Sequence, residues 1–319
     1  MKVLLLVNGS ASSVTARTRV LVRKALSREH DVTVAETSRR GHASRLAQGA
    51  AAANTDMVVV LGGDGTVNEA ANGLVGTHCA LAALPGGSTN VFARTLHTPD
   101  DPVEAIAVVL EAVRQGSIRR IGLPSVNGRY FLFHAGLGFD AAVVEQVEKR
   151  SSFKRYIGHP LFIWAGFATW FRHYDRSRPR MSFELADGSV VDDIYLAIVL
   201  NTNPYTYLGS KPLSVDPEAT IDSPLSALGV KTMKLTPMMR LVTQLIKGDG
   251  SVSTNPSVTY HPALLDLTVT GHGPFPYQVD GDHLGDTEEL VFQWRPDRLS
   301  LVVPMQSLRS PATQAVRQQ

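Results

Sequence analysis

The chain has 319 residues, of which 44% are hydrophobic and 19% charged, so it can form about two domains with buried cores and is not intrinsically disordered. Its formal net charge of +2 is too small to indicate nucleic-acid binding. The single cysteine, Cys79, excludes an internal disulfide and fits a reducing compartment.

The first third of the chain alternates strand and helix patterns. We expect these elements in turn over residues 3–7, 14–28, 31–35, 39–53, 57–61, 68–75, 80–84 and 102–115. This order is typical of a doubly wound, Rossmann-like α/β domain with a parallel sheet. The start, MKVLLLVNGS, is interpreted as the first buried strand rather than a signal peptide.

The pattern changes near residue 122. Strand-like runs at 130–134, 180–184, 193–200, 264–269 and 299–303 alternate with turn residues, and two helical stretches lie at about 141–173 and 236–247. This pattern predicts an antiparallel β-sandwich domain. We therefore expect domains at 1–122 and 123–310 with a flexible tail at 311–319, and no apolar run long enough to span a membrane.

A glycine-rich turn follows the third predicted strand. The segment VVVLGGDGTVNE (58–69) ends a buried strand on Gly62, Gly63, Asp64, Gly65 and Thr66. Ligands in open parallel sheets bind at the carboxyl ends of strands, and a helix N-terminus after such a turn favours phosphate. The carboxylate of Asp64 would suit Mg²⁺ or a hydroxyl there. The alternative is a tight turn in which Asp64 caps the following helix.

Two further strand ends carry similar turns. LAALPGGSTNVFAR (81–94) offers Ser88, Thr89 and Asn90, and VNGSASS (7–13) offers Asn8 and several serines. Three such strand ends at one sheet edge predict an anion site of nucleotide size. It is not a Walker loop, because GxxxxGK[ST] does not occur.

Together these motifs resemble the signatures of the diacylglycerol kinase catalytic-domain family. GGDGTVNE (62–69) and LPGGSTNVFAR (84–94) carry the resemblance most specifically. VNGSAS (7–12), TSRRGHASRLA (37–47), GLGFDA (136–141), NTNPYTYLG (201–209) and VDGD (279–282) are similar to further family elements in the same order. The resemblance implies an ATP-binding N-terminal domain with an NAD-kinase/phosphofructokinase-like fold and a C-terminal domain that binds a lipid substrate.

The implied reaction transfers the γ-phosphoryl group of ATP to the hydroxyl of diacylglycerol, with Mg²⁺. By motif position, the nucleotide contacts would be Asn8, Gly9, Ser10, Ala11, Ser12, Thr37, Gly62, Gly63, Asp64, Gly65, Thr66, Val67, Asn68, Glu69, Ser88 and Asn90. Ser88 stands where the family usually has Thr. Arg17 or Arg19 would supply positive charge, or lie on a solvated helix face.

The resemblance also implies two catalytic acids. Asp282 occupies the place of the family's general-base glutamate and is one methylene shorter; the alternative is a turn acid in an Asp- and Gly-rich loop. Asp64 would act through Mg²⁺ or by orienting the acceptor. Asp222, in DPEATIDSPL (216–225), stands at a position linked to a structural Mg²⁺, although Ser223 and Pro224 replace the family's glycine; a plain turn is the alternative.

Aromatic and basic residues at 149–180 and the segment KTMKLTPMMRLVTQLIK (231–247) predict contact with an anionic membrane surface, or ordinary core packing. We expect a cytoplasmic protein, peripheral at the inner membrane face, that binds ATP and a lipid alcohol and no nucleic acid. A homodimer is compatible with the sequence. Three functions compete: a diacylglycerol kinase, a kinase of a sphingoid base, another lipid alcohol or NAD, and a non-catalytic nucleotide- or lipid-binding module.

Overall fold

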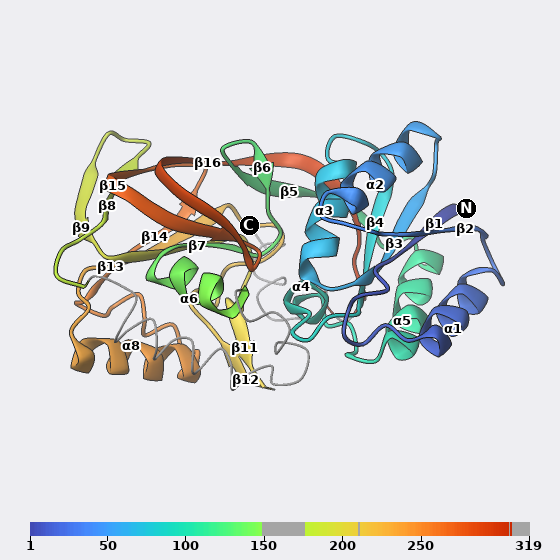
Figure 1. The fold of residues 1–319 in the computed structure, drawn as a ribbon, viewed down its shortest axis with the longest axis horizontal. Helices are drawn as coiled ribbons and strands as arrows, with labels where there is room; N and C mark the ends of the chain where they lie inside the picture. The colour runs from blue at the N-terminus through green and yellow to red at the C-terminus, as the bar shows by residue number, and fades with distance from the viewer. Residues whose placement is uncertain (149–175, 210, 306, 308–319) are drawn as a thin grey trace. The chain divides into compact units, whose positions relative to one another are not determined.

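The computed structural model describes residues 1–148, 176–209, 211–305 and 307. The chain forms two compact units (Figure 1): Met1–Leu123 with a second segment that begins at Pro296, and Pro124–Arg295. The predicted domains meet at nearly the same first boundary. They differ at the other end, because the chain returns to the first unit at Pro296. The predicted tail at 311–319 lies outside the described residues.

The first unit is an α/β layer structure, as its alternating pattern predicts. Its elements are β1 (Lys2–Val7), α1 (Ala16–Leu26), β2 (Asp31–Glu36), α2 (His42–Ala52), β3 (Met57–Gly62), α3 (Asp64–Leu74), β4 (Ala80–Pro85), α4 (Val91–Thr95), α5 (Pro102–Arg114) and the start of β5 (Ile118–Val126). Strand β16 (Asp282–Val302), from much later in the chain, also pairs in this sheet. The strand order is β16-β4-β3-β1-β2, and each of these pairs is parallel.

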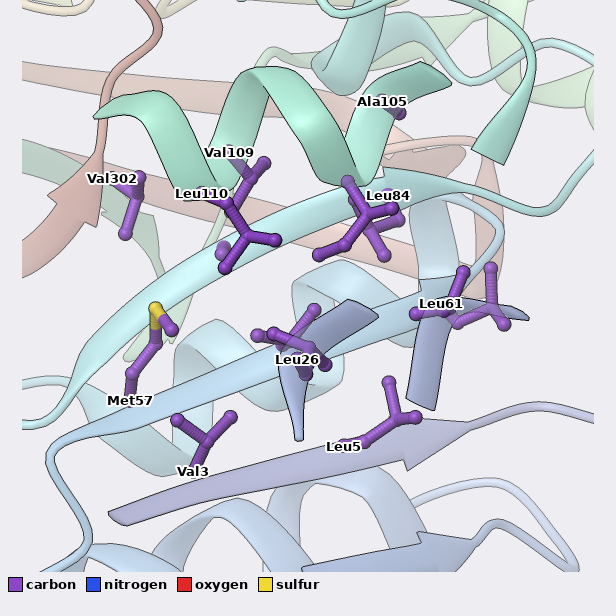
Figure 2. Packing of buried hydrophobic residues seen from close by; sticks show 14 of the residues in the cluster. Val3, Leu5, Leu26, Met57, Leu61, Leu84, Ala105, Val109, Leu110 and Val302 are labelled. Atoms are coloured by element: carbon purple, nitrogen blue, oxygen red, sulfur yellow. The ribbon is translucent and has the colours of Figure 1, made fainter. Parts of the chain in front are cut away.

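Strands β3 and β4 are buried at every position. Such continuous apolar runs are expected when helices cover both faces of a parallel sheet. On one face, alternate strand residues such as Leu5 and Leu61 pack against Leu26 of α1 and Val109 and Leu110 of α5 (Figure 2). Helices α2 and α3 lie against the other face (Figure 1). This packing fixes the carboxyl ends of the strands.

The second unit is dominated by antiparallel strands, which confirms the predicted change of architecture. Its elements are β6 (Arg129–Tyr130), β7 (His134–Gly138), α6 (Phe139–Glu148), β8 (Met181–Leu185), β9 (Val190–Ile194), β10 (Leu196–Leu200), β11 (Thr206–Leu208), β12 (Lys211–Leu213), β13 (Leu225–Val230), α8 (Leu235–Lys247), β14 (Val258–Leu264), β15 (Asp266–Val279) and β16 (Asp282–Val302). Strand β15 pairs with β8 through its first half and with β7 through its last three residues.

One predicted strand in this unit is wrong. Residues 130–134 form no continuous strand, because the chain bends between β6 and β7. Phe131 and Phe133 are buried there, so the apolar run is core without being strand. No helix among the described residues has the length and apolar character of a membrane span.

Candidate functional site

Four strand ends meet at one edge of the first unit. Because β2, β1, β3 and β4 are neighbouring parallel strands, the segments that follow them emerge on the same side. These segments are the loop after Val7, the residues from Thr37, the start of α3 and the turn after Pro85. Backbone hydrogen bonds join them: Asn8 N donates to Leu61 O (3.0 Å), and Thr37 N donates to Val7 O (2.9 Å).

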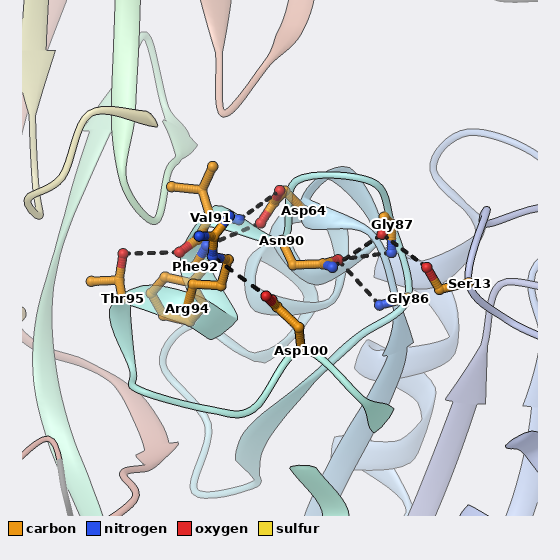
Figure 3. A network of polar contacts seen from close by, with 10 residues as sticks. All are labelled: Ser13, Asp64, Gly86, Gly87, Asn90, Val91, Phe92, Arg94, Thr95 and Asp100. Atoms are coloured by element: carbon orange, nitrogen blue, oxygen red, sulfur yellow. Dashed lines mark hydrogen bonds and ion pairs between the residues drawn. The ribbon is translucent and has the colours of Figure 1, made fainter. Parts of the chain in front are cut away.

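Helix α3 begins at Asp64, earlier than predicted. Asp64, Gly65 and Thr66 form its first turn rather than a loop, and Gly63 is its N-cap. The side chain of Asp64 does not cap its own helix. Its two carboxylate oxygens accept hydrogen bonds from the backbone N–H groups of Val91 and Phe92, each at 3.0 Å, at the start of α4 (Figure 3). Asp64 therefore holds the turn after β4 in place.

Glu69, one turn further along α3, makes the matching contact on the other side. Its carboxylate accepts from Gly41 N (2.8 Å) and Ala43 N (3.1 Å) at the start of α2. Gly41 has a φ of 75°, which favours glycine at this helix entry. The two acids of GGDGTVNE thus satisfy N–H groups at the starts of the two neighbouring helices.

The paired glycines allow two backbones to touch. A Cβ on Gly86 would lie 2.8 Å from Gly62 Cα, and a Cβ on Gly87 would lie 2.9 Å from Gly63 Cα. Contacts this short essentially never occur for a real Cβ. Gly86 and Gly87 are therefore required by the packing of the turn after β4 on the end of β3, before any ligand is considered.

The side chains of two asparagines also hold the loops at this sheet edge in place. Asn90 Oδ1 accepts from Gly86 N (3.2 Å) and Gly87 N (2.7 Å), and its Nδ2 donates to Gly87 O (3.0 Å), so its side chain closes its own turn (Figure 3). Asn8 Nδ2 donates to Thr66 Oγ1 (2.9 Å), and Asn8 Oδ1 accepts from Ser10 N (3.0 Å). Asn8 therefore ties the first loop to α3.

The remaining predicted nucleotide residues divide by exposure. The side chains of Ser10, Ser12 and Ser88 are exposed. Gly9 is also exposed, and Ala11, Thr37, Gly63 and Gly65 are intermediate. Gly62, Thr66, Val67 and Asn68 are buried. Arg17 is exposed, whereas Arg19 forms an ion pair with Glu36 at the end of β2.

The second predicted acid lies in the other unit, on a tight hairpin. Asp280 and Gly281, with φ of 49° and 82°, join β15 to β16, and Asp282 is the first residue of β16. The guanidinium of Arg129 lies 3.1 Å from the Asp282 carboxylate. The side chain of Asp282 is 24% exposed, so the carboxylate reaches solvent while it is held by the arginine.

Buried Asp280 anchors the same hairpin. Its carboxylate accepts three backbone hydrogen bonds, from Leu132 N (2.7 Å), Phe133 N (3.0 Å) and His134 N (3.1 Å). These are the amides of the segment for which a strand was predicted. They bond to a carboxylate instead of to a neighbouring strand, which explains why the chain bends there.

A buried polar chain supports the hairpin from its other side. Gln278 Nε2 donates to Asp140 (2.9 Å), and Gln278 Oε1 accepts from Gly281 N (2.8 Å). Tyr205 bonds to the other oxygen of Asp140. Burial raises the pKa of Asp140, while the bonds from Tyr205 and Gln278 act to lower it. The carboxylate occupies space that a Cβ on Gly136 would fill, which explains the first glycine of GLGFDA.

The sequence analysis did not predict this network of hydrogen-bonded side chains. Asp140, Tyr205 and Asp280 lie inside family-like motifs without an assigned role, whereas Arg129 and Gln278 belong to no predicted pattern. Burial also raises the pKa of Tyr205 well above its ordinary value. The ring of His134 packs at 4.5 Å from that of Tyr205, and burial lowers the pKa of His134 to about 3.

The segment around Asp222 forms a turn that is closed by its own hydrogen bonds. Thr220 and Ser223 bond to each other, with Thr220 N donating to Ser223 Oγ (2.8 Å) and Ser223 Oγ donating to Thr220 O (2.9 Å), so the segment closes a local turn. Nowhere in the described residues do three His, Cys, Asp or Glu side chains gather as metal ligands. A resident Mg²⁺ at Asp222 stays a prediction, and the donor set does not fit a site built from such ligands.

The predicted membrane-facing residues fall in two places. Most of the segment 149–180, through residue 175, lies outside the described residues. The segment 231–247 contains α8, which is described.

The fold and the strand-end edge define a two-unit protein with an α/β first unit of the kind that carries nucleotide sites. Residues 2–125 match the model of the diacylglycerol kinase catalytic domain. Over this segment, the resemblance to the diacylglycerol kinase catalytic-domain family that the motifs predicted is confirmed.

Curated relatives are similar to this chain over part of its length. A probable lipid kinase, YegS-like, of Chromohalobacter salexigens is 34% identical over 158 residues, and a diacylglycerol kinase of Bacillus subtilis is 28% identical over 223 residues. The first match spans 48% of this chain and about half of its relative (49%); the second spans 69% of this chain and 70% of its relative.

Solved structures share the fold along nearly the whole chain. A protein of Bacillus anthracis str. Sterne, described as a candidate diacylglycerol kinase, has a TM-score of 0.76 at 24% identity, and the match covers 98% of this chain and 96% of that one. An NAD kinase of Archaeoglobus fulgidus in complex with ATP has a TM-score of 0.52 at 13% identity over 98% and 99% of the two chains. These likenesses confirm the predicted fold class.

Proposed function

We propose that this protein is an ATP-dependent lipid kinase that transfers the γ-phosphoryl group to the hydroxyl of diacylglycerol and so produces phosphatidic acid. One observation carries the proposal. The segment that matches the diacylglycerol kinase catalytic domain, residues 2–125, is the segment that builds the strand-end edge with its glycine turns.

The geometry supports separate roles for the residues that position the turns and for those that contact the nucleotide phosphates. Asp64, Glu69 and Asn90 bind backbone N–H groups of their own unit, so we assign them the role of positioning the turns. Phosphate contacts then fall to the exposed hydroxyls of Ser10, Ser12 and Ser88, to glycine backbone, and to the start of α3, which has no side-chain cap. Mg²⁺ enters with ATP as part of the substrate and neutralises phosphate charge.

Asp282 is the proposed general base. It reaches solvent, and its hairpin is held by Asp280 and Gln278. Its carboxylate would take the proton of the acceptor hydroxyl as that oxygen bonds to the γ-phosphorus. The bond from the γ-phosphorus to the bridging oxygen breaks, and ADP leaves. Arg129 orients the carboxylate through their ion pair.

A different lipid alcohol, such as a sphingoid base, would use the same chemistry and is the alternative that keeps every contact above. The likeness to an NAD kinase concerns the fold alone. A non-catalytic binding module would have no use for a held, solvent-reaching carboxylate at 282.

The test is a transfer assay with radiolabelled ATP, Mg²⁺ and mixed micelles that contain diacylglycerol, sphingosine or no acceptor, with NAD in parallel. We expect label in phosphatidic acid. Label only in sphingosine phosphate or NADP would replace the acceptor in the proposal. ATP binding without transfer to any acceptor would contradict the kinase assignment.

A further inference from the structure

The inner face of α8 is fixed against the second unit. Leu241 is buried, and Met238 and Leu245 pack beside it on a cluster built from β10, β13 and neighbouring segments. Buried Gln244 donates to Ser251 O (2.9 Å) and accepts from Asn255 Nδ2 (2.6 Å). These contacts set the rotation of the helix about its axis.

The outer face of the same helix carries an apolar stripe. Leu235, Met239, Val242 and Ile246 are 59%, 57%, 41% and 42% exposed. Their spacing of four, three and four residues places all four side chains on one side of an α-helix. Single exposed apolar residues need no explanation, whereas a contiguous set marks an interaction surface. Since the helix cannot turn this stripe inward, packing within the described unit does not account for it.

The charges beside the stripe are positive. Arg240 and Lys247 each follow a stripe residue and are exposed, and Lys231 and Lys234 precede the helix. No Asp or Glu occurs from Lys231 to Lys247. Asp249 is the next acid along the chain, and its carboxylate accepts from Ser251 N (3.0 Å). An apolar stripe with a basic border is complementary to an anionic lipid surface.

We propose that the outer stripe of α8 docks this protein on an anionic bilayer. Leu235, Met239, Val242 and Ile246 enter the region below the headgroups, and Arg240 and Lys247 bind lipid phosphates. A second copy fits less well, because a two-fold contact through this stripe would bring identical basic borders together. The biological use of docking, access to a bilayer-borne acceptor, rests on the proposed function, whereas docking itself is measured without catalysis.

The experiment is co-sedimentation of the full chain with vesicles of phosphatidylcholine alone or mixed with phosphatidylglycerol. The double variant Met239→Gln/Ile246→Gln should lose on the order of tenfold or more in partition to the mixed vesicles. Arg240→Gln and Lys247→Gln should each lose about fivefold, and added salt should weaken wild-type binding. Val190→Gln/Leu265→Gln is the matched control, because those side chains are 57% and 52% exposed elsewhere in the same unit.

Several outcomes would overturn the proposal: no wild-type binding to either vesicle, equal binding by the stripe variant, or equal loss in the control. Light scattering adds one more outcome. If the wild type is a dimer and the stripe variant is a monomer, the stripe binds a second copy of the chain rather than a bilayer. Activity on a short-chain diacylglycerol in detergent micelles separates the two proposals. If the wild type binds vesicles but has no activity, the kinase proposal is contradicted. If the stripe variant keeps both its activity and its vesicle binding, the docking surface is contradicted.

Discussion

The buried amide of Gln278 donates to the carboxylate of Asp140 at 2.9 Å and accepts, through its other end, from the N–H group of Gly281. The residue after Gly281 is Asp282, so one side chain links the GLGFDA motif to the hairpin that presents the proposed base. Gln278→Met keeps the volume and removes both hydrogen bonds. We expect the free energy of unfolding to fall by about 1–3 kcal/mol for each buried group left unpaired, measured by urea denaturation.

Gln278→Met should also lower kcat more than it changes the Kd for ATP, because the hairpin lies outside the nucleotide-binding segment. An unchanged free energy of unfolding would show that the network carries no stability.

Asp282→Asn removes the proposed base without changing its size. We expect kcat to fall by about 10²–10⁴-fold while ATP binding, measured by calorimetry, is retained. Asp286→Asn, an exposed acid on the same strand, is the matched control and should keep wild-type activity. Near-wild-type turnover by Asp282→Asn would remove Asp282 from the mechanism.

Asp64→Asn replaces one acceptor oxygen by an NH₂ group. One of the two backbone N–H groups of Val91 and Phe92 then faces a donor, so the start of α4 should loosen. Hydrogen exchange should report faster exchange of these two amides, with a loss of about 1–3 kcal/mol in the free energy of unfolding. If both amides stay protected and only activity falls, Asp64 acts on substrate rather than on the frame.

Two helical glycines should respond to alanine with opposite signs. A Cβ on Gly73 of α3 would overlap the carbonyl oxygen of Ser44 in α2, whereas a Cβ on Gly49 of α2 meets nothing within 4 Å. Gly73→Ala should destabilise the protein by about 1–3 kcal/mol. Gly49→Ala should stabilise it by about 0.5–1 kcal/mol, because alanine is the better helix former. Chemical denaturation checks both, and the same sign for the two variants would refute the packing of α2 on α3.

His134 should make the protein sensitive to acid. Burial lowers its pKa to about 3 from an ordinary 6.5, so the folded protein keeps it neutral where the unfolded chain takes up a proton. Its contribution is fully present above pH 6.5 and is lost as pH falls toward 3, at up to about 1.4 kcal/mol per pH unit.

His134→Phe keeps an aromatic ring beside Tyr205 and removes this proton uptake. Urea denaturation between pH of about 4 and about 7 should give a smaller pH slope for the variant than for the wild type. Asp140, whose pKa burial raises, contributes a slope of opposite sign to both proteins, so the difference isolates His134. Parallel pH profiles would mean that His134 is protonated equally in both states.

The sequence predicts the architecture better than the roles of single side chains. Apolar runs that end in glycine turns locate β1, β3 and β4 and their shared edge, because strand burial and turn chemistry are local properties. What Asp64 and Glu69 bind could not be predicted, because their partners are backbone groups of other helices. The run from Phe131 to Phe133 shows the same limit, since a distant carboxylate, Asp280, takes the amides that a strand would have used.

The parallel pairing of Ser300 and Leu301 with β4 has a consequence for biosynthesis. During translation β4 is synthesised long before the last residues of β16. Until those residues are made, the β4 edge of the first unit's sheet has no partner strand. Such an edge can recruit strands from other chains. A gene fragment that stops at residue 125, the end of the family match, would leave that edge open permanently, and so would yield an aggregation-prone product rather than a working nucleotide-binding domain.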